Sequence, residues 1–526
     1  MRAETSRTLS DSARASGRER AAFAAVAALL SALAWLPVWS SVFPPLQDYP
    51  NHLAQVGVLR AGDAPDSPYA EHFTTDPGLR PYATFYTATL ALASVLPLEL
   101  AGRVALSVPG ALWLGLLLGG VRRRGGGEPW GALVWLPLSA GLAWHLGLVA
   151  YLWSLPLLGL ALEDQGRLAR GEGGRACALR LALWIAGLFL SHPFTFLAYL
   201  GLGALRLGCE RAETPSGSRG WLAWGAAAGL FVAWLAIAAG GRGVDGPGGV
   251  DWLPFAKSAE LLTLPFTGMR GFGDPDGASL AAWAVVGAAI ASAAWRRRGV
   301  PRFAGIALAL CAALGLAAPF RVGPFTFLNA RVAEIAFLCL GLAAGGLRLP
   351  ALGRVAVGVG VAAALALSTQ QQRRVALELA ELAPLLERIP PQAALLPLVF
   401  DASSPELSPS VCAPHLHVHH YFHVRRGGGV SPYFFRHPLG AVRYREGSPP
   451  TAPPQQRPSA YHPVHHGAWD HLLVRAAPPL FARRLAGVAE LVAEEGAWRL
   501  YAREPNALGA PRAGTGASPP PAARSR

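Results

Sequence analysis

Long apolar runs without charged residues recur along this chain between residues 21 and 368. The first run, residues 21–43, is long enough to cross a bilayer, which takes about 20 apolar residues in a helix. In lipid, every backbone polar group must be bonded within the chain, so consecutive runs of this kind fold into a bundle of helices. Only 15% of the 526 residues are charged, whereas a soluble domain carries roughly 25%. The pattern predicts an all-α polytopic membrane bundle and excludes a soluble enzyme.

Arg-rich segments between the apolar runs predict how the chain is oriented. Arg14, Arg18 and Arg20 precede the first run, and Arg triplets stand at 122–124 and 296–298. Basic residues beside membrane spans stay in the cytoplasm. Placing every basic segment on one side predicts about eleven spans and a cytoplasmic N-terminus, in a bacterial inner membrane. The net charge of +14 then reflects topology, and we expect no nucleic-acid partner.

The order of apolar and polar segments predicts the domain organisation. We expect a cytoplasmic tail at residues 1–20, the membrane bundle at 21–368 with its first outer loop at 44–100, a small extracytoplasmic α/β domain at 369–504 and a disordered tail at 505–526. In the α/β domain, the patterns predict strands at 393–400, 469–475 and 497–502 and a helix at 485–495. Within the bundle, breaks are predicted near Gly147 and at 191–193, where Pro193 interrupts an apolar run.

An acidic residue lies directly after the first span, in the segment Gln-Asp-Tyr-Pro-Asn-His-Leu-Ala at residues 47–54. Pro50 is suited to the first turn of a helix, which puts Asp48 at or just before the cap and His52 in the first turn. A carboxylate at the mouth of an apolar bundle is costly to desolvate, so Asp48 is a candidate site residue. The alternative is that Asp48 only caps the helix.

The first outer loop also contains an apolar, aromatic segment at residues 82–96. With roughly 15 residues it is too short for an ordinary span, and it suits an interfacial or re-entrant helix. We expect this segment to form one aromatic wall of a cavity that Asp48 faces.

Taken together, these features resemble the type-C (GT-C) superfamily of membrane glycosyltransferases, which includes bacterial aminoarabinose transferases and protein mannosyltransferases. The likeness rests on Asp48 after the first span, the segment at 82–96, Leu-Glu-Leu-Ala-Gly-Arg at 98–103, Asn-Ala-Arg at 329–331 and a soluble C-terminal domain. It implies transfer of a sugar from a polyprenyl-phosphate carrier to an extracytoplasmic acceptor, with Asp48 as the catalytic base. The expected partners are the lipid-linked sugar, membrane lipid and an acceptor of unknown identity.

The sequence departs from the family pattern at Tyr49, where family members often have a second acid. This departure argues against a metal site in the loop, so we expect no metal ligands there and leave a divalent cation as an open requirement. It also keeps open a catalytically inactive GT-C-like envelope protein.

The leaving lipid phosphate requires positive charge nearby. The candidate substrate-binding residues are His52, Tyr82, His192, Lys257 and Arg331. Arg331 offers a planar fork for phosphate oxygens, although it could instead pair with Glu334 one helical turn later. For His192 the alternative is a hydrogen bond that ends a helix.

A histidine-rich segment, His-Leu-His-Val-His-His-Tyr-Phe-His, occupies residues 415–423. His415, His417 and His419 would share a face in a strand, and His415, His419 and His423 would do so in a helix. Either spacing permits zinc, but no Asp, Glu or Cys stands beside the segment, so we expect a solvated or substrate-lining loop. The five cysteines are scattered, without a Cys-x-x-Cys pair.

A transporter or flippase is the alternative function from another class. Such proteins usually carry ionisable residues in mid-membrane along a pathway. Here His145, His192 and Glu334 are expected near the outer ends of spans, which favours chemistry at one membrane surface.

Overall fold

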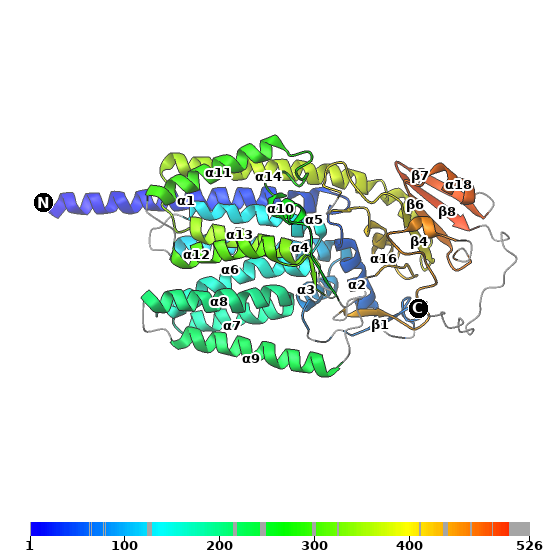
Figure 1. Cartoon of the computed structure of the whole chain (residues 1–526), viewed down its shortest axis with the longest axis horizontal. Coiled ribbons are helices and arrows are strands. Elements are labelled where there is room, and N and C mark those ends of the chain that lie inside the picture. Colours follow the sequence, from blue (N-terminus) through cyan, green and yellow to red (C-terminus); the bar gives the residue numbers. More distant parts are fainter. Residues whose placement is uncertain are drawn as a thin grey trace.

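Most of the chain is helical, and a small region containing strands follows near its C-terminus (Figure 1). The computed structural model describes residues 2–62, 64, 66–76, 78, 80–123, 129–213, 218–241, 249–296, 301–322, 326–409, 412–434, 440–462, 465, 467–485 and 488–503. The predicted tail at 505–526 lies outside the described residues.

The long helices lie side by side along the longest axis of the molecule (Figure 1). They are α1 (Arg2–Ser40), α4 (Leu98–Arg123), α6 (Val149–Ala169), α7 (Arg175–Ser191), α8 (Pro193–Glu213), α9 (Ser218–Gly241), α11 (Gly277–Arg296), α12 (Arg302–Ala317), α13 (Leu328–Ala344) and α14 (Ala351–Ala380). Helix α6 is buried on nearly all sides, as expected for a helix without charged residues from Val149 to Leu162. We call this assembly the bundle.

Four of the described helical segments are long and apolar enough to cross a membrane: Gly17–Ser40, Leu98–Gly119, Gly277–Arg296 and Ala351–Glu387. Shorter apolar helices cover Ala83–Ala93, Gly220–Trp234 and Arg302–Ala317. These segments suggest membrane association, but they do not confirm the predicted eleven spans. The boundary predicted at residue 368 falls inside α14, which continues without a break to Ala380.

The two breaks predicted inside the bundle are confirmed. Gly147 ends the short helix α5 (Leu142–Leu146) with φ +71°, and α6 begins at Val149. His192 separates α7 from α8, and Pro193 is the first residue of α8. The segment before α5 is the 3₁₀ helix η1 (Trp130–Ala140), which contains Pro137.

The first loop contributes α2 (Tyr49–Ala61), β1 (Phe73–Thr75) and α3 (Ala83–Ala93). They lie beyond the end of the bundle opposite the N-terminus (Figure 1). Helix α3 agrees with the short helix predicted at 82–96. Strand β1 pairs antiparallel with β5 (Val442–Tyr444), with Phe73 opposite Tyr444. The first loop is therefore bonded to the C-terminal region, by which we mean residues 381–503.

The C-terminal region is built on a four-stranded sheet in the order β4-β6-β8-β7. Its strands are β4 (Leu395–Val399), β6 (His471–Arg475), β7 (Ala489–Glu495) and β8 (Trp498–Arg503), and β4 and β6 are parallel. Leu396, Leu398 and Leu472 pack with Trp469 in one core of this region. The predicted strands are confirmed, and the small mixed domain agrees with the predicted fold class.

The helix predicted at 485–495 is wrong, because most of that segment is the strand β7. Gly496, with φ +54°, allows a tight turn between β7 and β8, and β7 forms an antiparallel ladder with β8 from Ala489 to Glu495. Pairing with a neighbouring strand overrides the helical pattern of the segment. Only the preceding residues are helical, in α18 (Pro479–Leu485).

The remaining elements are short. They are β2 (Val250–Asp251), α10 (Phe255–Thr263), β3 (Arg321–Val322), α15 (Ala383–Glu387), η2 (Val418–His420), α16 (Tyr421–Arg425) and η3 (Pro458–Ala460). Strands β2 and β3 pair antiparallel.

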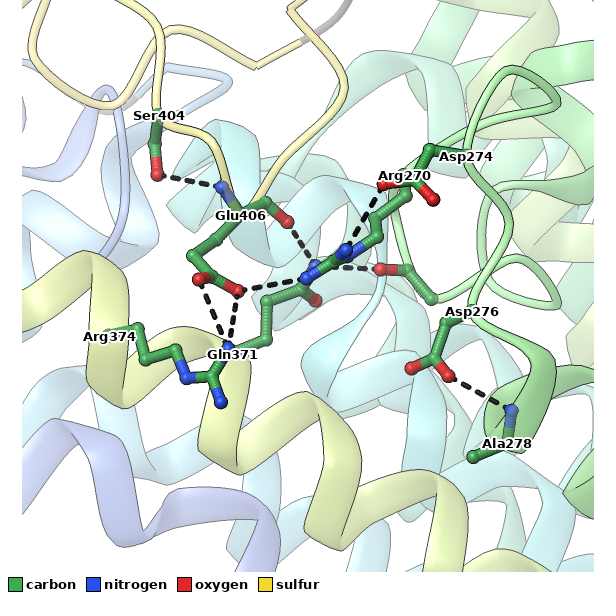
Figure 2. Close-up of polar contacts among 9 residues, drawn as sticks. Arg270, Asp274, Asp276, Ala278, Gln371, Arg374, Ser404 and Glu406 are labelled. Atoms are coloured by element: carbon green, nitrogen blue, oxygen red, sulfur yellow. Dashed lines mark hydrogen bonds and ion pairs between the residues drawn. The ribbon is translucent and has the colours of Figure 1, made fainter.

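A polar cluster fastens the C-terminal region to the bundle (Figure 2). Glu406 accepts hydrogen bonds from Arg270 Nη2 at 3.3 Å and from Arg374 Nη1 at 3.2 Å. Gln371 Nε2 donates to the carbonyl oxygens of Gly268, at 2.7 Å, and of Glu406. The loop before α11, helix α14 and the segment around Glu406 thereby hold one another in place.

Candidate functional site

The backbone of Asp48 is held by the turn between α5 and α6. Gln47 N donates to His145 O at 3.0 Å, and Asp48 N donates to Leu146 O at 3.1 Å. Gly147 makes this approach possible, because a Cβ at that position would lie 2.7 Å from Asp48 N. The main chain therefore places Asp48 at the end of the bundle that adjoins the C-terminal region.

Asp48 occupies the N-cap position of α2, with Pro50 in the first turn, as the sequence predicted. Its side chain, however, makes no capping hydrogen bond. The carboxylate instead accepts a hydrogen bond from Gln47 Nε2 at 3.2 Å. The geometry therefore does not support the alternative in which Asp48 serves only as a cap.

The electrostatic surroundings of Asp48 favour titration near neutral pH. Its side chain is only 16% exposed. Burial raises the pKa of Asp48 from 3.8 to about 7, while the hydrogen bond from Gln47 and the positive charge of Arg331 oppose this rise. A carboxyl group with a pKa close to the working pH is suited to general-base chemistry.

Arg331 and His192 meet between α13 and the α7–α8 junction. Arg331 Nη1 lies 2.8 Å from His192 Nε2. A guanidinium group can only donate, so His192 Nε2 is the acceptor, and the proton of the neutral ring is on Nδ1. The guanidinium carbon also lies 5.5 Å from the ring centroid of Tyr151. Arg331 is 8% exposed, and its Nε has no hydrogen-bond partner among the described residues.

The alternative ion pair between Arg331 and Glu334 is not formed. Glu334 Oε1 accepts a hydrogen bond from the backbone N of Ala143 at 2.8 Å, in the first turn of α5. Within the described ranges, no carboxylate forms an ion pair with Arg331. The guanidinium group therefore keeps positive charge available for another anion.

Tyr82 joins Arg331 and His192 from the first loop. Its ring lies edge-on to that of His192, with 4.9 Å between centroids. Burial raises the pKa of Tyr82, and the charge of Arg331 and its hydrogen bond to Tyr82 oppose this rise. Tyr82 has φ +72°, a conformation that is strained for a residue with a side chain. Three predicted site residues from separate elements are thus brought together.

His52 lies against α3, the helix in the segment that was predicted to form a wall near Asp48. His52 Nδ1 is 2.6 Å from the hydroxyl oxygen of Tyr86. The ring of His52 also contacts Phe85 and Tyr86 edge-on. Burial raises the pKa of Tyr86, and the negative charge of Asp48 adds to that rise. Helix α3 therefore contributes aromatic residues to the surroundings of Asp48, while a cavity at this point stays a prediction.

Lys257 has a different environment from the other candidates. It lies in α10, is 51% exposed and forms an ion pair with Glu260 at 2.7 Å. Among the described residues, no contact joins Lys257 to Asp48 or Arg331. The structure therefore does not bring Lys257 together with the other site residues.

The C-terminal region covers Asp48, and the sequence did not predict this contact. The backbone N of Ala413 donates to Gln47 Oε1 at 2.7 Å, and His417 Nε2 lies 3.6 Å from Asp48 Oδ1. Cys412 is near enough that the charge of Asp48 adds to burial in raising its pKa to about 12. The sequence drew attention to the histidines at residues 415–423, but nothing in their pattern indicated that they lie beside Asp48.

The histidine segment is buried, so the prediction of a solvated loop is wrong. All five of its histidines are buried, namely His415, His417, His419, His420 and His423. They lie in and around η2 and α16, and not in a strand or in one continuous helix. The rings of His417 and His420 are parallel to within 16°, at 6.0 Å. Burial lowers the pKa of His417 and His423 to about 3, so both rings are neutral at physiological pH.

Tyr49 is a packing residue in this arrangement. It is buried against α4, where its hydroxyl approaches the backbone of Gly102 so closely that a Cβ there would collide with it. Asp48 therefore has no second acid next to it at position 49. In the part of the chain that the structure describes, no group of three or more His, Cys, Asp or Glu residues could hold a metal ion.

Comparison with protein-family models, with curated proteins and with solved structures gives no match to this chain. Its function must therefore be inferred from the arrangement of Asp48, Arg331 and their neighbours.

Proposed function

We propose that this protein is a GT-C-like membrane glycosyltransferase. It moves a sugar from a polyprenyl-phosphate carrier to an extracytoplasmic acceptor, with Asp48 as the base. The observation that carries the proposal is a pair of side chains at one end of the bundle, the largely buried carboxyl of Asp48 and the buried guanidinium of Arg331. They are close enough for Arg331 to favour the ionised form of Asp48, and no ion pair between them occurs in the described structure.

Glycosyl transfer requires a base and a positive charge in separate positions. The base removes a proton from the acceptor hydroxyl, while the lipid phosphate leaves from the other face of the sugar. Asp48 has the pKa for the first role, and a positioned base contributes roughly 10²–10⁴-fold. Arg331 has a guanidinium nitrogen without a partner among the described residues, which suits it to donate a hydrogen bond to a phosphate oxygen.

In the proposal, a sugar binds beside the aromatic groups that lie near these two residues. Tyr82 adjoins Arg331, and Tyr86 adjoins Asp48 through His52. Sugar rings bind through their apolar faces to aromatic side chains, while polar groups at the edge fix their orientation. In the proposal, Tyr82 and His192 orient the donor beside Arg331, and His52 helps to orient the acceptor beside Asp48.

The membrane arrangement is part of the proposal. Beyond the four apolar segments, we propose that other bundle helices also cross the bilayer, to about eleven spans. The N-terminus is cytoplasmic, the C-terminal region lies outside, and the membrane is a bacterial inner membrane. The ion pair between Arg354 and Glu19, at 3.2 Å, supports this orientation, because it joins the start of α14 to the N-terminal part of α1. Arg354 thus lies at the N-terminal part of α1, the end that the charge rule assigns to the cytoplasm.

The residues around Asp48 do not fit a bound divalent cation. Mg²⁺ and related ions prefer several oxygen ligands, whereas Tyr49 replaces the second acid and packs against α4. The proposed reaction therefore uses Arg331 for the phosphate, and none of its steps depends on a metal.

The experiment uses the full-length protein in proteoliposomes with polyprenyl-phosphate carriers that bear a radiolabelled hexose or pentose. With a cell-envelope extract as the source of acceptor, we expect the label to leave the lipid fraction. Asp48→Asn and Arg331→Gln abolish this transfer, while Arg354→Gln, at the other end of the bundle, preserves it. Movement of intact donor across the bilayer without transfer would indicate a flippase instead. Donor that binds but keeps its label with every acceptor fraction would indicate an inactive GT-C-like envelope protein.

A further inference from the structure

His417 reaches Asp48 from the C-terminal region, although long stretches of chain separate the two residues. The imidazole is buried, and its Nε2 is the atom that faces Asp48 Oδ1, at 3.6 Å. This distance is slightly longer than a hydrogen bond. Catalytic hydrogen bonds are often long in a free enzyme and shorten when substrate binds. The contact therefore brings a potential donor to the carboxylate.

Gln455 determines which nitrogen of His417 carries the proton. Gln455 Nε2 lies 3.3 Å from the carbonyl oxygen of Leu416, to which only an amide nitrogen can donate. This bond fixes the orientation of the amide. The same Nε2 lies 3.4 Å from His417 Nδ1, so His417 Nδ1 is an acceptor. The proton of a neutral imidazole is then on Nε2, the atom that faces Asp48.

We propose that His417 is a positioning residue for Asp48: its Nε2–H donates to the ionised carboxylate, and Gln455 holds it in the required tautomer. The Asp48 site is then complete only when the C-terminal region is docked on the first loop. The inference takes Asp48 as the base of the proposed function, but the test below requires neither donor nor acceptor.

The burial of His417 indicates whether its ring donates a hydrogen bond to Asp48 or carries protons to and from it. Burial lowers the pKa of His417 to about 3, so the ring does not take up a second proton near neutral pH. His419 and His420, which lie beside it, have pKa values shifted in the same direction by burial. The row of rings is therefore unsuited to carry protons away from Asp48, whereas a neutral N–H donor is well suited to hold a carboxylate.

The other groups that face Asp48 either favour its ionised form or are neutral. Arg331 and Gln47 favour the ionised form. Tyr86 and Cys412 are neutral at physiological pH, because burial raises the pKa of each. His52 is bonded to Tyr86. Among these groups, only His417 belongs to the histidine segment 415–423. Replacing it therefore shows how contact with that segment changes the pKa of Asp48.

The test is an infrared titration of the full-length protein in detergent. The carbonyl stretch of a protonated carboxyl group is assigned to Asp48 by its absence in Asp48→Asn, and its intensity is followed against pH. A donor to the ionised form lowers a carboxyl pKa. We therefore expect His417→Phe to raise the midpoint by about one pH unit, a tenfold change in proton affinity. His417→Gln, whose amide nitrogen replaces Nε2, restores most of the original midpoint.

Two further variants make the result decisive. His423→Phe, another buried histidine of the same segment, leaves the midpoint in place, because its Nε2 is bonded to Ser431 Oγ at 2.8 Å. Gln455→Leu keeps the imidazole of His417 but removes the hydrogen bond that holds its proton on Nε2. The midpoint should therefore rise by less than in His417→Phe. Should His417→Phe not fold, the Gln455→Leu and His417→Gln titrations still decide the question. An unchanged midpoint in Gln455→Leu, or an equal shift in His423→Phe, would overturn the proposal whether or not the protein transfers sugar.

Discussion

Arg331 Nη1 lies 2.8 Å from His192 Nε2 and joins helix α13 to the junction between α7 and α8. Because arginine donates, this contact keeps His192 neutral and leaves the positive charge on Arg331. Glu334, one helical turn later, is bonded instead to the backbone of α5. A buried cation without a carboxylate partner is costly unless it binds an anion, and the first prediction follows from this.

Replacing Arg331 should weaken binding of a lipid phosphate. We expect Arg331→Met to weaken binding of a fluorescent polyprenyl phosphate by at least tenfold, because a charge-assisted hydrogen bond of about 1.5–3 kcal/mol is lost. Arg331→Lys recovers little of the affinity, since a lysine lacks the planar fork. Binding is measured by fluorescence titration in detergent. Arg354→Gln, which removes a cation at the other end of the bundle, is the control, and equal losses in both variants would refute a specific site.

Asp48→Asn should separate catalysis from folding. Asparagine has nearly the same size as aspartate, and the Asp48 side chain makes no capping hydrogen bond that could be lost, so the variant should insert and fold normally. Sugar transfer should fall by a hundredfold or more, because the base is absent. In the wild type, the rate should rise with pH through about 7, where Asp48 ionises. A variant that transfers sugar at the wild-type rate would restrict Asp48 to a structural role.

The same substitution should stabilise the protein in alkaline solution. The pKa of Asp48 is 3.8 in the unfolded chain, where the carboxyl is solvated, and about 7 in the folded protein, where it is buried. Between these values the folded state binds a proton that the unfolded state lacks, so stability falls as pH rises from about 4 to about 7. The difference amounts to about 4 kcal/mol above that range. Thermal unfolding in detergent should show Asp48→Asn more stable than wild type at about pH 8, with the two converging near pH 4.

Gly147→Ala should displace Asp48 through the backbone. The substitution adds strain at φ +71° and brings a Cβ to 2.7 Å from Asp48 N. Gly427→Ala is a matched control, because its φ of +68° is similar but a Cβ there meets nothing within 4 Å. We expect about 1–2 kcal/mol of strain in both variants. Only Gly147→Ala should also shift the pH midpoint of Asp48 in the infrared titration, and equal midpoints in the two variants would contradict this account.

Acid should destabilise the C-terminal region. Burial lowers the pKa of all five histidines of the segment from 6.5. Below pH 6.5 the unfolded state binds protons that the folded state does not. The free energy of unfolding is therefore highest above pH 6.5 and decreases as the pH falls below that value. Each histidine adds up to about 1.4 kcal/mol per pH unit to the slope. Limited proteolysis of the region against pH should show the loss.

A double variant tests that the cluster is the cause of this acid sensitivity. His420→Phe with His423→Leu should make the pH dependence shallower, because two groups no longer gain protons on unfolding. His462→Ala, an exposed histidine of the same region, is the control. A double variant with the wild-type slope would place the acid sensitivity elsewhere in the chain.

Local pattern alone determined much of this protein. The apolar runs predicted the helices, Gly147 and Pro193 predicted the breaks, and Pro50 predicted that Asp48 precedes a helix. Helical periodicity, turn residues and caps act over a few neighbouring residues, so they can be read directly from the sequence. The sequence also identified Asp48, His192 and Arg331 as candidate site residues, each with a structural alternative that it left open.

Only the tertiary structure decided which of these residues meet. Arg331 pairs with His192 and not with Glu334, and Asp48 faces His417 from the opposite end of the chain. Residues 489–495 form a strand because β8 lies beside them. Hydrogen bonds and strand pairing between distant segments depend on the packing of the whole chain, which leaves no periodic trace in the sequence. Burial, which moves the pKa of Asp48 to about 7 and keeps His417 neutral, is likewise a property of the folded assembly.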